Sequence, residues 1–393
     1  MKNPYKANIW KMYVFKFLSS LHFFGGVLVP FFLDWGGISF TWVMILMSFY
    51  LISIFFLEVP TGAVADYLGR KTSLIFAAIA TFIGVIFYSI YPSLILFFIA
   101  EFFWAMGTAL LSGADKALVY DSMKKAKILK KSKKIFARLQ TVSLVSIMVA
   151  APIGSLIAAT LGLRYAMLLF AVPVFFAALI GLTLKEPKTT KKVESKRYIK
   201  VLTSGITYFK KHRVLQMLTF DKAVIYVLVF FLIWLYQPLL TQQNVPIVYF
   251  GFILAAILGA EILVLNSFGF WEKLVGGKKR YLMITALLSG VCFIILGFNT
   301  IVFITIILFL IIMGFGLTRS VLFDNYMNRY IKSENRATVL STTEMISNFG
   351  SAIAYPLVGL SVEWSLNYTF VIIGVLIIIF ALVSRVKEEH LID

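Results

Sequence analysis

The stretch GAVADYLGRK, residues 62–71, joins two long apolar runs and decides the fold. Gly69 allows a tight turn, and Gly62 permits close contact between the helices that the two runs predict. The two basic residues that end the stretch are expected to stay on the cytoplasmic side of a membrane. Asp66 is placed to accept hydrogen bonds from the N-terminal amides of a facing helix, where an anion is favoured. The alternative interpretation is a plain basic turn.

Outside this stretch the composition is that of a membrane protein. Of the 393 residues 60% are hydrophobic and 14% are charged, against roughly 45–50% and about 25% in soluble domains. At about 20 residues per span, the length allows about twelve spanning helices. An all-α membrane protein of twelve transmembrane helices is therefore predicted. Apolar runs lie at about residues 8–33, 39–61, 73–91, 94–121, 138–161, 164–184, 214–240, 247–270, 281–298, 300–328, 338–361 and 367–384.

The charge distribution predicts the orientation. Lys and Arg number 37 against 18 Asp and Glu, a net charge of +19. In a soluble chain this excess would suggest nucleic acid, but here the basic residues lie in alternate segments between apolar runs, as the positive-inside rule requires. Both termini are therefore expected in the cytoplasm, and no nucleic-acid partner is expected. The basic segments are the N-terminus, 66–71, 124–138, 185–213, 272–280, 329–336 and 385–393.

Few residues are available for metal or disulfide chemistry. Cys292 is the only cysteine, which excludes a disulfide framework and a cysteine-based metal site. The three histidines are scattered along the chain. We therefore expect no metal and no cofactor.

The longest polar stretch, residues 185–213, separates six predicted spans from six others. It predicts an N-terminal six-helix bundle over 1–184, a cytoplasmic basic linker, and a C-terminal bundle with a short tail over 214–393. The linker is interpreted as a solvated segment near anionic lipid headgroups; the alternative is a partner-binding tail.

The two halves repeat each other weakly. Met106-Gly107 is followed by Lys131-Ser132 and then Arg138, while Met313-Gly314 is followed by Lys332-Ser333 and then Arg336. The segment 272–280 of the second half also repeats the acid, glycines and bases of residues 62–71, with the spacing shifted by one. Such repeats are the structural basis of alternating-access transporters.

Residues 62–71 match the signature G-x-x-x-D-x-x-G-R-K, and the chain thereby resembles the major facilitator superfamily. The resemblance implies two pseudo-symmetric six-helix halves and a loop that latches them in the outward-facing state. Ala151-Pro152-Ile153-Gly154-Ser155 resembles the Gly-Pro-rich motif of bacterial drug/proton antiporters, although its first glycine is missing. Asp121 is placed to pair with the signature arginine. The implied conformational-switch residues are Gly62, Asp66, Gly69, Arg70, Lys71 and Asp121.

Polar residues in the fourth apolar run form a stripe. On a continuous helix Glu101, Thr108, Ser112 and Asp115 share one face. A polar stripe on an apolar span should line water rather than lipid, and in the superfamily the fourth span lines the central cavity. These residues are candidates for the substrate cavity and for proton coupling.

Other ionisable groups lie inside apolar runs. Glu261, near the middle of the eighth run, is a candidate proton carrier, and Glu344 lies on a polar face of the eleventh. His22, near the middle of the first run, is a candidate proton sensor. For each of these groups the alternative is a structural hydrogen bond or ion pair between helices.

Basic residues in the runs need partners. Lys16 and Lys222 lie close enough to the cytoplasmic ends to snorkel. Arg319 lies too deep for that, so it requires a carboxylate or an anionic substrate. Asp324 is one candidate, although it lies about 140° away around the same helix.

These observations predict a secondary transporter of the bacterial plasma membrane. The usage rich in Lys, Ile and Phe is what suggests a bacterial genome. The leading hypothesis is proton-coupled efflux of amphipathic drug-like compounds; the alternative is proton-coupled uptake or export of a specific metabolite. The absence of a P-loop pattern disfavours ATP-driven pumping. A lipid-handling or enzymatic membrane protein is the rival from another class; no H-E-x-x-H pattern occurs, but a Ser/His dyad that uses His22 stays open. The expected partners are a small-molecule substrate, protons and the lipid bilayer, and we expect a monomer without enzymatic activity.

Overall fold

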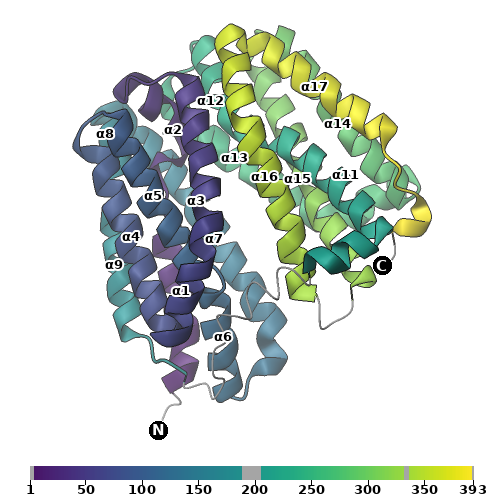
Figure 1. The fold of residues 1–393 in the computed structure, drawn as a ribbon. Coiled ribbons are helices and arrows are strands. Elements are labelled where there is room, and N and C mark those ends of the chain that lie inside the picture. The colour runs from purple at the N-terminus through teal and green to yellow at the C-terminus, as the bar shows by residue number, and fades with distance from the viewer. Residues whose placement is uncertain (1–3, 188–204, 332–335, 392–393) are drawn as a thin grey trace. The chain divides into compact units, whose positions relative to one another are not determined.

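The computed structural model describes residues 4–187, 205–331 and 336–391, and in these ranges the chain folds into helices and turns without strands (Figure 1). Eleven of the described helices are long and apolar enough to cross a membrane. The protein is therefore a helical, multi-pass membrane protein. The sequence predicted twelve spans, and it is the first apolar run that does not appear among the eleven.

The first run is a broken helix. A continuous helix was predicted over residues 8–33, but α1 (Pro4–Ser19) ends before His22. Three short pieces follow: a 3₁₀ turn η1 (Phe23–Gly26), α2 (Leu28–Pro30) and a π-helical segment η2 (Phe31–Trp35). The adjacent glycines at 25 and 26 favour a break, because glycine is a poor helix former. Hydropathy alone does not register such a break.

Two compact units make up the chain, and α3 (Phe40–Tyr67) and α13 (Phe250–Val275) contribute to both. Unit 1 comprises residues 1–38, 46–195 and 247–255. Its remaining helices are α4 (Arg70–Ile90), α5 (Leu94–Leu111), α6 (Ala114–Lys125), η3 (Leu129–Lys131), α7 (Ser132–Thr160), α8 (Leu163–Leu168), α9 (Ala171–Thr183) and η4 (Ile247–Tyr249).

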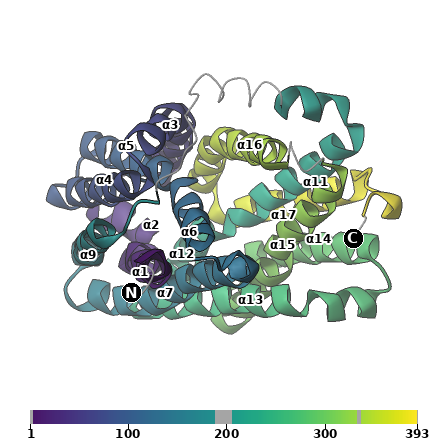
Figure 2. The same cartoon turned by 90° about the horizontal axis from the view of Figure 1, so that it is seen from below.

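Unit 2 comprises residues 39–45, 196–246 and 256–393. Within it α14 packs against α15 and α17, and α11 also packs against both (Figures 1 and 2). Small residues allow this: a Cβ on Gly290 of α14 would lie 2.9 Å from the carbonyl oxygen of Gly374 on α17. The helices are α11 (Arg213–Phe230), α12 (Leu232–Gln242), α14 (Lys278–Phe298), α15 (Val302–Tyr330), α16 (Arg336–Trp364), α17 (Leu366–Val383) and η5 (Glu388–His390).

The α3–α4 turn of unit 1 is closed by a carboxylate cap. Gly69 has φ +94°, a region that favours glycine, and so confirms the predicted tight turn. The backbone amides of Arg70 and Lys71 donate to the two carboxylate oxygens of Glu186, at 3.1 and 2.7 Å. Glu186 follows the end of α9, so it ties the sixth apolar run to the start of α4. An anion is favoured at this helix N-terminus.

The α13–α14 turn of unit 2 repeats this cap. Gly277 has φ +138°. The backbone amides of Lys278 and Lys279 donate to the carboxylate oxygens of Glu388, at 3.1 and 2.9 Å. Glu388 follows the end of α17, as Glu186 follows α9. The internal repeat seen weakly in the sequence is therefore present as a repeated capping geometry.

Gly62 does not make the close helix contact predicted for it. The residue lies inside α3, and a Cβ built on it would have no atom within 4 Å. The turn itself is confined to residues 68–69. The predicted loop is thus mostly helix, because residues 62–67 continue α3.

Several predicted features lie partly outside the described residues. Of the predicted linker 185–213, the structure describes 185–187 and 205–213. Lys332 and Ser333 of the second repeat also fall outside. The division into bundles over 1–184 and 214–393 remains a prediction.

Candidate functional site

A cavity of about 250 Å³ lies inside unit 1, bounded by α1, α3, α4, α5, α7 and α9. A water molecule occupies about 30 Å³ in the liquid, so the cavity has room for a small solute. Its lining is polar for a membrane interior and includes Lys16, His22 and Trp104. Six hydroxyl side chains complete the polar lining: Ser19, Ser20, Tyr50, Thr81, Thr108 and Ser143.

These hydroxyl groups are held in pairs or on the backbone. Tyr50 Oη and Thr108 Oγ1 are 3.0 Å apart, and Ser20 Oγ and Ser143 Oγ are 2.8 Å apart. A hydroxyl both donates and accepts, so each pair can exchange its internal bond for one to a solute. Thr108 was predicted from the stripe on the fourth run, whereas Tyr50 was not.

His22 and Trp104, which line the cavity, belong to a cluster of packed aromatic rings. The His22 ring lies 5.0 Å from Phe170 and 6.1 Å from Trp104, and Phe24 stacks on it at 5.2 Å. His22 stands at the break in the first run, as the residue before η1. Discontinuous helices frequently form the substrate sites of transporters. The sequence identified His22 but not the break.

Glu101 lies on α5, about one turn before Trp104, and its side chain is buried, at 3% exposure. Its carboxyl hydrogen-bonds with the hydroxyl of Tyr88 on α4, and it interacts electrostatically with Tyr50. Among the described residues no base pairs with it. Tyr88 in turn contacts Trp104 of the cavity wall, ring centroids 6.2 Å apart. Two tyrosines that the sequence analysis missed therefore connect the carboxyl to the cavity.

The predicted polar stripe does not continue past Thr108. Helix α5 ends at Leu111, Ser112 has ψ 123°, and Gly113 has φ +73°. The helical register is lost at this break, so Ser112 and Asp115 do not extend the face of Glu101. Ser112 is exposed. Its assignment to a continuous stripe was wrong because the sequence analysis assumed an unbroken helix.

Asp115 begins α6 and pairs with Lys16 of α1, Nζ to Oδ2 3.7 Å. The two side chains are 18% and 22% exposed. Lys16 was expected to be able to snorkel; the packing of α1 against α6 gives it a carboxylate partner. The ammonium group of Lys16 is also part of the cavity lining.

In unit 2 two ion pairs join α11 to α15. Arg319 Nη2 lies 3.0 Å from Asp221 Oδ1, with both side chains under 10% exposed. Lys222 pairs with Asp324. The sequence suggested Asp324 as the partner of Arg319, but Asp324 pairs with Lys222. The two residues lie about 140° apart around α15, so their side chains leave the helix in different directions. Asp221 was missed; its position beside Lys222 on one helix was the available signal.

The remaining acids of the apolar runs gather around one tyrosine of unit 2. Tyr226 on α11 lies within electrostatic reach of Glu261 on α13, Glu344 on α16 and Asp324. Glu261 is partly buried and Glu344 is exposed. The structure thus places the predicted residues Glu261 and Glu344 each within electrostatic reach of Tyr226, in a different unit from Glu101.

The signature residues form an ion pair beside the α3–α4 turn. Arg70 Nη1 pairs with Asp121 of α6 and donates to the carbonyl oxygen of Ala117 at 2.8 Å. The predicted pairing of Arg70 with Asp121 is confirmed. The side chain of Lys71 donates to the carbonyl oxygen of Leu182 at 2.7 Å. Asp66 is exposed near the end of α3, and its partnership with another helix remains a prediction.

No group of three or more His, Cys, Asp or Glu side chains suited to a metal ion occurs among the described residues. The groups that line the cavity of unit 1 offer hydrogen bonding, aromatic contacts and a basic side chain to a solute.

Comparison with known proteins identifies the family of the chain and structures with a similar fold. The profile of the Major Facilitator Superfamily matches residues 14–265 and 223–391. A search of curated protein sequences finds no match. The fold is similar to the nucleoside transporter NupG, with a TM-score of 0.80 and 15% identity over 96% of this chain and 99% of that one.

Two further solved structures are similar at the level of the fold. A POT family transporter in complex with 5-aminolevulinic acid has a TM-score of 0.76 and 14% identity, covering 98% of this chain and 97% of that one. A bacterial homologue of the human lysosomal transporter Spinster has a TM-score of 0.75 and 14% identity, covering 100% and 99%.

Proposed function

Because the chain belongs to the major facilitator superfamily, we propose that it is a proton-coupled secondary transporter whose substrate is a small, hydroxyl-bearing polar solute with a flat ring. The observation that carries the proposal is the cavity of unit 1, where six hydroxyl groups and two basic side chains converge around Trp104. Hydroxyl groups that can exchange their internal hydrogen bonds for bonds to a solute favour a polar solute, since a hydroxyl both donates and accepts. A nucleoside, the class named for the similar NupG structure, has this chemistry.

Glu101 is the proposed proton carrier. A charged carboxylate in an apolar span is costly unless it is paired, and no described base pairs with Glu101. The carboxyl should therefore hold its proton while it is enclosed and release it when water reaches the site. Its bond to Tyr88 and its interaction with Tyr50 make that release sensitive to whether the cavity is filled.

The proposal also covers the side of the membrane on which the termini lie and the ion pair that stabilises one end state. The asymmetry of Lys and Arg along the chain supports termini on the cytoplasmic side of a bacterial plasma membrane. The ion pair of Arg70 with Asp121 of α6 ties the signature turn to α6 and is proposed to stabilise one end state of the transport cycle.

A second candidate is efflux of flat amphipathic cations by proton antiport. The rings of His22 and Trp104, which line the cavity and pack against Phe170, favour it together with the buried carboxyl of Glu101. The hydroxyl-rich lining of the cavity weighs against it, since a hydrophobic cation gains no hydrogen bond from those groups.

Transport by purified protein in liposomes tests the proposal. With an imposed proton gradient, a panel of nucleosides, sugars and amphipathic cations is supplied while solute uptake and internal pH are recorded together. We expect a ring-bearing polar solute to move with protons. If only the amphipathic cations exchange for protons, the efflux candidate replaces the proposed one.

Variants of Glu101 test the carrier. Glu101→Gln keeps the size and hydrogen-bonding capacity of the side chain but cannot release a proton. It should lose gradient-driven accumulation while still exchanging solute for solute across the membrane. Glu389→Gln, at a side chain 68% exposed, is the control and should behave as wild type. Gradient-driven accumulation that survives in Glu101→Gln would exclude Glu101 as the carrier.

A further inference from the structure

Two adjoining cavities lie in unit 2, where α11 begins and α17 ends. The larger, about 390 Å³, is lined mostly by apolar side chains of these two helices and by Arg385. The smaller, about 110 Å³, is lined by Lys279 and Arg319. Asp221 and Ser384 line both cavities, so the two adjoin at these residues.

The charges at this site leave an excess of positive charge. Asp221 is the acid that lines both cavities, and its carboxylate is already paired with Arg319 at 3.0 Å. Within the described part of the chain, neither Lys279 nor Arg385 forms an ion pair with an acid. Each cavity is therefore lined by one basic residue without an ion pair among the described residues, Arg385 in the larger and Lys279 in the smaller, while Asp221 and Arg319 offset each other.

The larger cavity lies beside exposed apolar side chains of two helices that are suited to cross a membrane. Phe220 on α11 is 61% exposed and Val383 on α17 is 67% exposed. Both helices are among those long and apolar enough to cross the membrane. Met217, Val224 and Phe380 continue the apolar lining. The groove therefore offers apolar side chains where an acyl chain would lie, one end of it bordered by cations.

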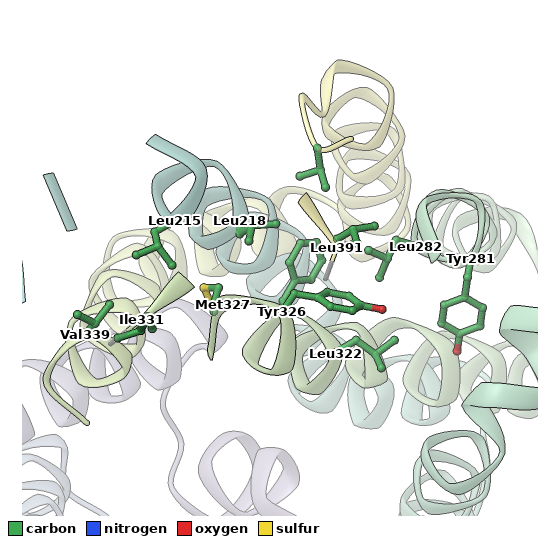
Figure 3. Packing of buried hydrophobic residues seen from close by; sticks show 12 residues of the cluster. Leu215, Leu218, Tyr281, Leu282, Leu322, Tyr326, Met327, Ile331, Val339 and Leu391 are labelled. Carbon is green, nitrogen blue, oxygen red and sulfur yellow. The ribbon is translucent and has the colours of Figure 1, made fainter. Parts of the chain in front are cut away.

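The segment of residues 386–391, which follows α17, holds Ser384 and Arg385 in place. Val386 and Leu391 are buried, at 5% and 3% exposure, in a cluster with Leu282 of α14, and Figure 3 shows Leu391 close to Leu282. Glu388 binds the first amides of α14. Ser384 and Arg385 are thus fixed between the end of α17 and a packed segment, which preorganises the site.

We propose that this site binds an anionic phospholipid of the cytoplasmic leaflet. Its phosphate lies between Lys279 and Arg385, with the hydroxyl of Ser384 as a hydrogen-bond donor, and one acyl chain follows the groove between α11 and α17. The basic segments place this end of both helices on the cytoplasmic side, where anionic lipids attract basic residues. Basic recesses between helices on that side suit such headgroups.

Native mass spectrometry of the whole delipidated protein tests the proposal. Phosphatidylglycerol and phosphatidylcholine with identical acyl chains are added in equal amounts, and the retained lipids are counted. About 1 kcal/mol per basic residue near the headgroup corresponds to roughly fivefold in affinity, so the two residues should favour phosphatidylglycerol about 25-fold. Equal retention of the two lipids by the wild type would overturn the proposal.

Three variants locate the site. Lys279→Gln with Arg385→Gln should reduce phosphatidylglycerol retention to the level of phosphatidylcholine. Lys273→Gln with Arg280→Gln removes the same charge from exposed residues outside both cavities and should leave the preference intact. Val224→Trp fills the groove without changing charge and should lower retention of both lipids. If the control pair abolishes the preference as fully as the first pair does, binding reflects overall charge and the site is wrong.

Discussion

Replacing Asp221 by Asn would leave the guanidinium of Arg319 buried without its carboxylate. The two groups are 3.0 Å apart and their side chains are 7% and 6% exposed. At an effective dielectric constant of about 20, unit charges at that distance attract by about 5–6 kcal/mol. Removing one partner of a buried pair costs about 3–5 kcal/mol, so unit 2 should be destabilised by about that amount.

The loss should be visible as a lower melting temperature. A change of 1 kcal/mol moves the midpoint by roughly 2–4 °C in a unit of about 150–250 residues, which predicts a fall of about 6–20 °C for Asp221→Asn. Purified protein in detergent, heated in steps and scored by the folded fraction on size exclusion, measures this. Glu389→Gln is the control, since the Lys387–Glu389 pair is about 70% exposed and such pairs contribute little.

The double variant Asp221→Asn with Arg319→Gln separates pairing from packing. Neutralising both partners removes the stranded charge, so the double variant should be destabilised by clearly less than the sum of the two single variants. Losses that simply add would show that the two charges do not interact, and the reasoning from their distance and burial would fail.

Three further predictions concern the turns and the cavity. Gly277→Ala, at φ +138°, should lower the melting temperature by the equivalent of about 1–3 kcal/mol, whereas Gly62→Ala, helical and open, should leave it unchanged or raise it. Glu186→Ala removes two bonds from the start of α4 and should reduce stability by about 1–2 kcal/mol; a smaller effect than Glu389→Ala would contradict the cap. Tyr50→Phe removes a cavity hydroxyl and should weaken solute binding about tenfold, measured by tracer binding, with Phe56→Leu on the exposed surface as the control.

Much of this protein can be predicted from its sequence. Apolar runs of about twenty residues locate helices, because in lipid each backbone polar group must be bonded within its own helix. The α3–α4 turn could be predicted because Gly69 adopts a backbone angle that other residues rarely take. The pairing of Arg70 with Asp121 followed from both lying at the same end of neighbouring spans.

The tertiary structure decided what depends on packing between helices. The breaks at residues 20–22 and 112–113 are invisible to hydropathy, which averages over a window and does not see one residue's dihedral angles. The partners of Lys16 and Arg319 could not be predicted, since the distance between side chains of two helices depends on how those helices rotate and pack. For the same reason Tyr88 and Tyr50 became part of the candidate site only when the packing of α3, α4 and α5 placed them near Glu101.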